Sequence, residues 1–297
     1  MKIKFIGTGS AFTMKSFQSN IVITENDRNL LFDAGGDVRF ALDEQGMSYK
    51  DINAMYLSHQ HADHIGGVEY VAFCSHFDPS VEHKVQLFGN SKLLRDSWKN
   101  SLKGGLESIQ GKVFALEDYF DVSMIPENGK FIWEDNIFET VQAVHIMNGR
   151  SIVPTYGLMI TAKSGKKVYL TGDTQYCPNQ IMDFYKEADV IIQDCETYPF
   201  KSGVHANYED LKTLPVDIKA KMHLVHMNDN IFQDTKNIVS SEIKSYIDTW
   251  ETSDGLNLND MLKHFNKFNR VLSYEWANKV KVDGFASITQ LGDELEV

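Results

Sequence analysis

Short apolar runs, separated by glycine-containing or polar turns, recur along most of the chain. In residues 2–7, 20–24, 29–36 and 52–58 the apolar positions alternate with polar ones or run continuously over a few residues, which predicts β-strands. Residues 37–46 and 66–77 predict helices, the first of them closed by Gly46. The same criteria predict later strands over 84–89, 137–145, 156–162, 166–173, 188–194 and 221–226, and a short helix over 207–215.

The alternation of strands with helices favours an α/β fold in which helices cover the sheets. Polar or histidine residues recur where the predicted strands end, so we expect a site built from loops at one edge of the sheets. The chain shows no internal period of the kind that repeat proteins have, and a single domain over residues 1–297 is predicted.

Two segments with mainly helical patterns, 90–112 and 229–280, are predicted to elaborate this domain. The second is expected to be a helical C-terminal elaboration. The first is expected to be a lid or interface insertion, hinged at Gly104 and Gly105, that covers the site or a neighbouring subunit's site rather than packing deep in the core. An ordinary surface helix is the alternative. The apolar positions at helical spacing in this first segment are Leu93, Leu94, Trp98 and Leu102.

The charge and the cysteines narrow the class of protein. The 29 basic and 41 acidic residues give a net charge of −12, which disfavours a broad nucleic-acid footprint but not a small anionic substrate drawn in by cations. No stretch approaches the ~20 apolar residues of a membrane helix, and the N-terminus lacks the apolar run of a signal peptide. The three cysteines lack metal-ligand spacing, so a reduced, cytoplasmic location is expected.

The densest chemical signal is the stretch SHQHADHIGG at residues 58–67, directly after a predicted apolar strand. On a loop leaving a strand, alternate side chains can converge, so His59 and His61 can reach one cation while Asp63 and His64 reach a second. Solvated loop histidines are the alternative, which the crowding of the cluster disfavours. Two cations about 3.5–4 Å apart can share one hydroxide, and this donor set suits zinc, with manganese as a rival.

The His-x-His-x-Asp-His pattern after a strand resembles the signature of the metallo-β-lactamase superfamily. The resemblance covers residues 1 to about 228 and implies an αβ/βα sandwich of two facing mixed sheets flanked by helices, with a dinuclear metal site at one edge. It also implies three further ligands in chain order and a structural partner near the site at Asp33. Those ligands are His145 to the first metal, Asp173 bridging both metals, and His226 to the second metal.

His226 has a competitor in His223. Strand alternation places these two histidines on opposite faces, and His226 is preferred because it meets the polar residues at the strand end.

A two-metal site can cleave lactams, thioesters, lactones or phosphodiesters, so the fold alone does not choose the reaction. His205, in the loop before the 207–215 helix, resembles the histidine that lies near the scissile phosphate in ribonuclease Z and related phosphodiesterases. Such a histidine can protonate the leaving oxygen or stabilise charge, although a helix-capping role is the alternative. The opening FIGTGSAF resembles the same branch. Asp63 and His205 are therefore the expected catalytic residues.

Within this branch the chain resembles small cyclic-nucleotide phosphodiesterases, including the anti-Pycsar enzymes of phages and bacteria, more than a tRNA-processing ribonuclease Z. That resemblance implies a homodimer that hydrolyses cyclic mononucleotides such as cCMP and cUMP, and possibly cAMP and cGMP, to nucleoside monophosphates. A ribonuclease Z-like tRNA 3′ endonuclease, another hydrolase of this fold and a metal-free scaffold are the alternatives.

Several other side chains are weaker candidates. Arg150 can contact phosphate, with surface exposure as the commoner explanation. His76, His83 and His264 are expected to be structural or solvated. The candidates for base stacking, each more commonly a packing residue, are Phe12, Phe17, Phe77, Tyr198 and Phe200.

Overall fold

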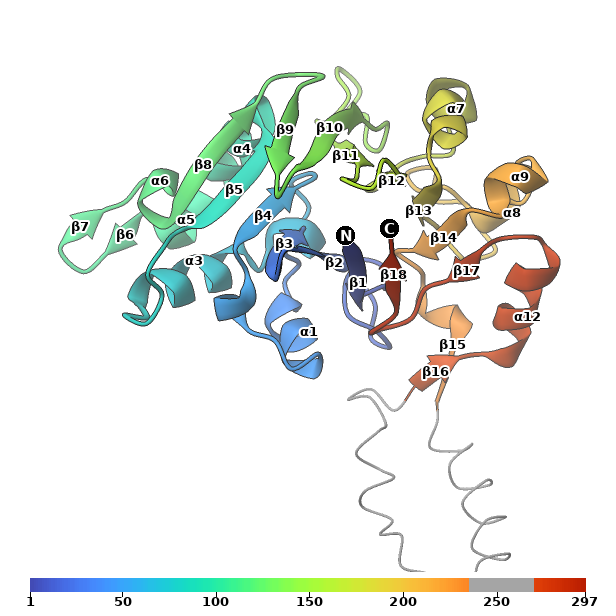
Figure 1. Ribbon diagram of the computed structural model, residues 1–297, viewed down its shortest axis with the longest axis horizontal. Coiled ribbons are helices and arrows are strands. Elements are labelled where there is room, and N and C mark those ends of the chain that lie inside the picture. Colours follow the sequence, from blue (N-terminus) through green and yellow to red (C-terminus); the bar gives the residue numbers. More distant parts are fainter. Residues whose placement is uncertain (235–269) are drawn as a thin grey trace, which may run out of the picture.

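The computed structural model describes residues 1–234 and 270–297 and shows two seven-stranded mixed sheets (Figure 1). The first sheet contains, in spatial order, β18 (Glu294–Glu296), β1 (Lys2–Gly7), β2 (Asn20–Glu25), β3 (Arg28–Phe32), β4 (Ala54–Leu57), β5 (Val85–Asn90) and β8 (Phe120–Ile125). The second contains β17 (Ser287–Ile288), β14 (Met222–Val225), β13 (Val190–Asp194), β12 (Lys167–Leu170), β11 (Tyr156–Thr161), β10 (Asn136–Gln142) and β9 (Lys130–Trp133).

Short helices and two small strand pairs complete the described part. The helices are α1 (Val38–Glu44), α2 (Ala62–Ile65), α3 (Val68–Phe77), α4 (Ser91–Ser97), α5 (Lys103–Leu106), α6 (Leu116–Tyr119), α7 (Pro178–Glu187), α8 (Tyr208–Leu211), α9 (Val216–Lys219) and α12 (Tyr274–Val282). The tighter or wider turns are the 3₁₀-helices η1 (Tyr49–Asp51) and η3 (Asp229–Ile231) and the π-helix η2 (Trp98–Leu102). The pairs are β6 (Ser108–Ile109) with β7 (Lys112–Val113), and β15 (Phe232–Asp234) with β16 (Arg270–Leu272).

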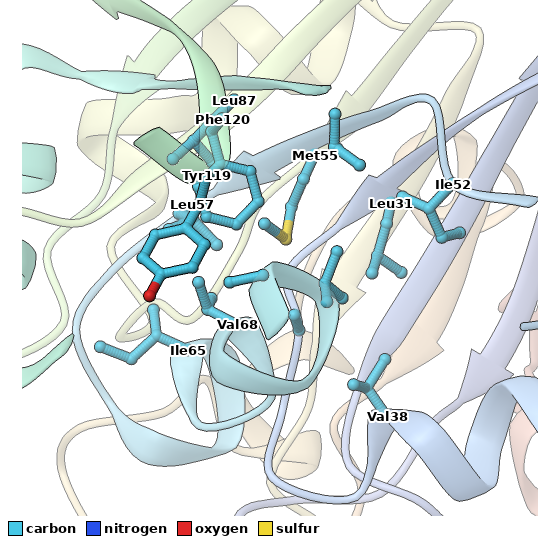
Figure 2. Close-up of a cluster of buried hydrophobic side chains, with 14 of the residues drawn as sticks. Leu31, Val38, Ile52, Met55, Leu57, Ile65, Val68, Leu87, Tyr119 and Phe120 are labelled. Atoms are coloured by element: carbon cyan, nitrogen blue, oxygen red, sulfur yellow. The ribbon is translucent and has the colours of Figure 1, made fainter. Parts of the chain in front are cut away.

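Three apolar layers follow from the two-residue period of the strands. In β3, Leu30 and Phe32 face the other sheet, whereas Leu31 faces the helices. Figure 2 shows the outer layer of the first sheet, where Leu31 and Met55 lie near Val38 of α1. The order helix, sheet, sheet, helix confirms the predicted αβ/βα sandwich.

The predicted strands and helices of residues 1–90 and 156–226 are present with small shifts of their ends. β10 ends at Gln142, so His145 lies in the loop after the strand rather than at its last position. The elements that were not predicted include β8, β9, β17, β18 and α7. In β8 the apolar pattern is irregular, because exposed Asp121, Ser123 and Met124 interrupt the buried positions.

Segment 90–112 forms α4, η2, α5 and the β6–β7 pair. The expectation that it stays off the core is wrong, because Leu93, Leu94 and Leu102 are buried and the last two belong to the apolar layer outside the first sheet. A role at a subunit interface stays a prediction. Much of the expected C-terminal elaboration over 229–280, with His264, lies outside the described residues, and its described part combines α12 with the β15–β16 pair.

The parallel halves of the two sheets position the site. β3, β4 and β5 run parallel in the first sheet, as do β12, β13 and β14 in the second, and the loops after several of these strands gather at one edge of the sandwich. Carboxyl ends of parallel strands commonly form binding crevices. Within residues 1–234 and 270–297, no helix has the length and apolar character needed to cross a membrane.

The layer between the sheets should dominate the stability of the fold. Phe138 stacks on Phe131 with ring centroids 4.7 Å apart and is fully buried. Phe138→Ala should lower the free energy of unfolding by about 3–5 kcal/mol, because it leaves a cavity in a packed core. Ile132→Ala on neighbouring β9 is the matched control, since Ile132 is 69% exposed and should change stability by less than about 0.5 kcal/mol. Urea denaturation followed by circular dichroism measures both, and equal losses would contradict this account.

Candidate metal centre

The structure brings all seven predicted ligands together at the edge where the two sheets meet. The first sheet supplies four of them from the loop and short helix after β4, and the second sheet supplies three from the segments after β10, β12 and β14. The four are His59, His61, Asp63 and His64, and the three are His145, Asp173 and His226.

One half of the centre is formed by three imidazoles. His61 Nδ1 lies 3.0 Å from His59 Nε2 and 3.2 Å from His145 Nε2. Asp173 Oδ2 lies 3.7 Å from both His59 Nε2 and His145 Nε2. These four ligand atoms therefore enclose one small space.

The other half shares Asp173 with the first. Asp173 Oδ2 lies 3.2 Å from His64 Nε2 and 3.5 Å from His226 Nε2. Asp63 Oδ2 lies 3.1 Å from His64 Nε2 and 3.3 Å from His226 Nε2. Asp173 is thus the one side chain that belongs to both groups, which is the position of a bridging carboxylate.

Both halves fit a divalent cation. Ligands about 2.0–2.1 Å from a tetrahedral zinc ion are separated from one another by roughly 3.3 Å, and the observed separations lie around this value. His64 Nε2 and Asp173 Oδ2 are buried without a hydrogen-bond partner, which is costly for polar atoms unless a cation binds them. Nitrogen and carboxylate donors of this kind suit zinc, manganese or iron.

Hydrogen bonds on the far side of the rings turn the free nitrogens inward. His64 Nδ1 donates to Asp33 Oδ2 at 2.7 Å. His59 Nδ1 lies 3.0 Å from Ser58 Oγ, which in turn donates to Asp33 Oδ2 at 2.6 Å. One carboxylate therefore fixes the ring orientation of a ligand in each half, as outer partners of metal-bound histidines do. The predicted structural role of Asp33 is confirmed.

His145 is fixed in the same way by a backbone carbonyl. Its Nδ1 lies 2.8 Å from the Val204 oxygen, to which it donates, so Nε2 is free to bind a cation. Asp33 and His226 have positive φ angles of 63° and 61°, values uncommon outside glycine. Residues held in this conformation cluster at functional sites, where the surrounding structure enforces it.

The titration behaviour of the rings is consistent with cation binding. Burial lowers the pKa of His59 well below its usual value, and the neighbouring charge of His64 lowers it further, so the ring stays neutral. Burial also lowers the pKa of His64. The charges of the Asp173 and Asp33 carboxylates raise it by more, so the pKa of His64 lies well above its usual value. A proton and a cation compete for the same nitrogen there, so metal binding would release a proton.

His205 lies beside the centre, and its partner is Asp194 at the end of β13. His205 Nδ1 donates to Asp194 Oδ2 at 2.8 Å, and its ring stacks on that of His226 at 4.7 Å. Burial lowers the pKa of His205, but the charge of Asp194 and this hydrogen bond outweigh burial and raise it.

Sequence reasoning missed Asp194. Its Oδ1 lies 3.4 Å from His226 Nδ1, so the Asp194 carboxylate contacts both histidines and forms its hydrogen bond with His205. The sequence feature that could have identified it is its place at the end of an apolar strand, since Asp33 and Asp173 also come after apolar strands.

A cavity of about 250 Å³ adjoins this side of the centre and is lined by His205, His226 and three of the predicted base-stacking residues, Phe12, Tyr198 and Phe200. Phe17 is buried in the core and is excluded from such a role. Phe77 is exposed on α3 and packs against Phe73 outside this cavity.

Arg150 and three other histidines of the described residues lie apart from the seven ligands. His223 bonds to Ser287 Oγ at 2.7 Å, which confirms that it faces away from the centre. His76 packs edge-on against Phe114. His83 lines a separate surface hollow with Tyr49, and Arg150 is exposed in the loop after His145.

Comparison with known proteins agrees with this geometry. The chain is 30% identical over 234 residues to an anti-Pycsar protein Apyc1 of Paenibacillus sp. (strain J14), which covers 78% of this chain and 91% of that relative. It is 30% identical over 238 residues to the anti-Pycsar protein Apyc1 of Bacillus phage BSP38, covering 77% and 90%. The metallo-β-lactamase fold protein YhfI from Bacillus subtilis has a similar structure, with a TM-score of 0.64, 17% identity and 99% of each chain covered. A family model described as anti-Pycsar protein Apyc1 matches residues 1–249, and the chain therefore belongs to this family of metallo-β-lactamase-fold proteins.

Proposed function

We propose that this metal-dependent phosphodiesterase hydrolyses cyclic mononucleotides, with cCMP, cUMP, cAMP and cGMP as the substrates to be compared, to nucleoside monophosphates. The observation that carries the proposal is the pairing of two cation-sized donor groups, joined by Asp173, with a hydrogen-bonded histidine at the rim of an open cavity. The family is that of the anti-Pycsar protein Apyc1. A small cavity suits a mononucleotide better than a folded RNA.

The ligand assignment is part of this proposal. His59, His61 and His145 would hold one divalent ion, and Asp63, His64 and His226 the other, with Asp173 shared. When bound, two such ions lower the pKa of water and stabilise charge on a phosphoryl oxygen. We expect zinc, with manganese as the rival, and a homodimer in the cytoplasm. Metal analysis tests the identity of the metal, and light scattering tests the homodimer.

His205 would act on the leaving oxygen. Asp194 holds Nδ1, so Nε2 is the ring nitrogen left to meet a substrate in the cavity that His205 lines. The raised pKa favours the protonated ring, and a protonated imidazole can donate to the ribose 3′-oxygen as the P–O bond breaks. Asp194 would position the ring and stabilise its charge.

A substrate panel tests the proposal directly. The purified, metal-loaded protein should hydrolyse cyclic mononucleotides and bis(p-nitrophenyl) phosphate, and should leave a precursor tRNA and nitrocefin intact. Cleavage of the tRNA without cyclic-nucleotide turnover would instead assign a ribonuclease Z-like activity.

Removing metal or its inner ligands should abolish turnover. Elemental analysis should find close to two divalent ions per chain, lost to a strong chelator together with activity. His61→Ala and Asp63→Ala should each bind less metal and lose activity, because each deletes a donor from one group. His223→Ala is the matched control, since His223 bonds to Ser287 and should keep both ions. Full activity in metal-free protein would refute the ligand assignment.

The role of His205 should depend on the leaving group. A ribose alkoxide needs a proton as it departs, whereas p-nitrophenolate does not, so His205→Ala should lose about 10²–10⁴-fold on a cyclic nucleotide and far less on bis(p-nitrophenyl) phosphate. Metal content should be unchanged. Equal losses on both substrates would indicate positioning, and loss of metal would make His205 a ligand, because its ring nitrogen lies 4.0 Å from Asp173 Oδ2.

Asp33 should tune metal affinity without touching the metal. Asp33→Asn weakens the hydrogen bonds that orient His64 directly and His59 through Ser58. Loss of such outer partners typically lowers affinity about 10- to 100-fold, and activity should return at saturating metal. Competition titration with a chromogenic chelator measures the change, and unaltered affinity would show that the rings are held by packing alone.

A further inference from the structure

The cavity beside His205 has two aromatic walls that come from distant parts of the chain. Phe12 lies in the loop after β1, and Tyr198 and Phe200 lie in the loop between β13 and α8. The rings of Tyr198 and Phe200 are parallel within 14° and 5.3 Å apart. Phe12 is 93% exposed and Phe200 is 65% exposed, so these rings present bare aromatic surface at the mouth of the site. Exposed aromatic groups of this kind mark binding surfaces.

The Phe12 wall is fixed to the segment that follows His226. The Asp229 carboxylate accepts from Thr13 Oγ1 at 2.7 Å, from the Met14 amide at 2.8 Å and from the Lys15 amide at 3.2 Å. A carboxylate that accepts several hydrogen bonds from one loop holds its backbone in a single conformation. These bonds therefore fix the loop that carries Phe12 to the segment that follows His226.

The Tyr198–Phe200 wall is fixed to the same segment. Asn228 Oδ1 accepts from the Thr197 amide at 2.8 Å and from the Tyr198 amide at 3.3 Å. Asn230 Oδ1 accepts from Thr197 Oγ1 at 2.8 Å, and its Nδ2 donates to the Thr197 carbonyl at 3.0 Å. Three consecutive residues after His226 thus hold both aromatic walls at a set distance from the centre.

We propose that this cavity is the nucleobase subsite of the enzyme, in which the base lies against the aromatic side chains of Phe12, Tyr198 and Phe200. This rests on the proposed function, because it places a cyclic phosphate at the metal centre. His205 and His226 line both the cavity and the centre, so a ligand whose phosphate lies there projects its base into the cavity. One polar side chain of the lining, Glu196, is held within the loop, because its carboxylate accepts from the Ser202 amide and from Asn207 Nδ2. The aromatic rings of the lining offer stacking, an interaction that every base can make.

Two substrates that differ only in the base test the subsite. One is a cyclic mononucleotide, and the other is methyl riboside 3′,5′-cyclic phosphate, which keeps the sugar and phosphate and lacks the base. Phe200→Ala in the full-length, metal-loaded protein should lose about 10- to 100-fold in kcat/KM on the nucleotide and little on the base-free diester. Phe200→Leu should fall between, because it keeps apolar area but no ring. Phe12→Ala should show the same pattern.

Phe77→Ala is the matched control, since Phe77 is an exposed phenylalanine on α3 away from the cavity, and it should change neither substrate. Equal losses on both substrates, or no loss on the nucleotide, would overturn the subsite. So would a lower molecular mass of Phe12→Ala by light scattering, which would assign the aromatic walls to contact with a second copy. A wild-type protein that turns over the base-free diester but no nucleotide would refute the proposed function instead. Calorimetric titration then measures the affinity for the cyclic nucleotide independently of turnover. Binding to Phe200→Ala that is about tenfold weaker than to the wild type supports the subsite, and unchanged binding refutes it.

Discussion

Mutual repulsion among lone pairs is the constraint on which this molecule depends. Three overlapping groups of four side chains, each containing Asp173, have ligand atoms within 4.8 Å of one another inside each group, and two of these groups hold the seven predicted ligands. Buried nitrogen and oxygen lone pairs at such distances are unfavourable unless a proton or a cation lies between them. The fold must therefore hold the donors in place before any cation binds. Hydrogen bonds to Asp33, Ser58 and the Val204 carbonyl do this for His64, His59 and His145, whose rings they fix from outside.

The sandwich supplies the rigidity that this arrangement needs. Its two sheets present parallel strands whose ends face the same edge, and the apolar layer between them is closely packed, with rings such as those of Phe88 and Phe131 stacked 4.2 Å apart. Because each half of the centre draws ligands from both sheets, a slip of one sheet against the other would separate the donors. The geometry of the metal centre therefore depends on the packing of the apolar layer between the sheets.

Sequence predicts the contiguous part of the site well and the dispersed part less directly. His59 to His64 stand out because four donors follow one strand, whereas His145, Asp173 and His226 were placed through their order in a resembling family. The role of Asp194 is not predictable from sequence, because one aspartate at a strand end cannot be distinguished from a turn residue. The structure shows its role by placing His205 beside it. Helical spacing in 90–112 likewise says which residues share a face but not which surface that face meets, and here it meets the first sheet.

The strands β17 and β18 have a consequence for how the chain folds. They are close neighbours in the chain, yet β17 pairs with β14 of the second sheet and β18 with β1 of the first. Both sheets are therefore completed by the same late segment, because β1 pairs with β2 on one side and gains β18 on its other side only after the other six strands of its sheet have been synthesised. Contacts of such long sequence separation close slowly, so the nascent protein passes through a stage with two open sheet edges. We expect chaperone dependence at this stage to be governed by the C-terminal strands rather than by the metal ligands.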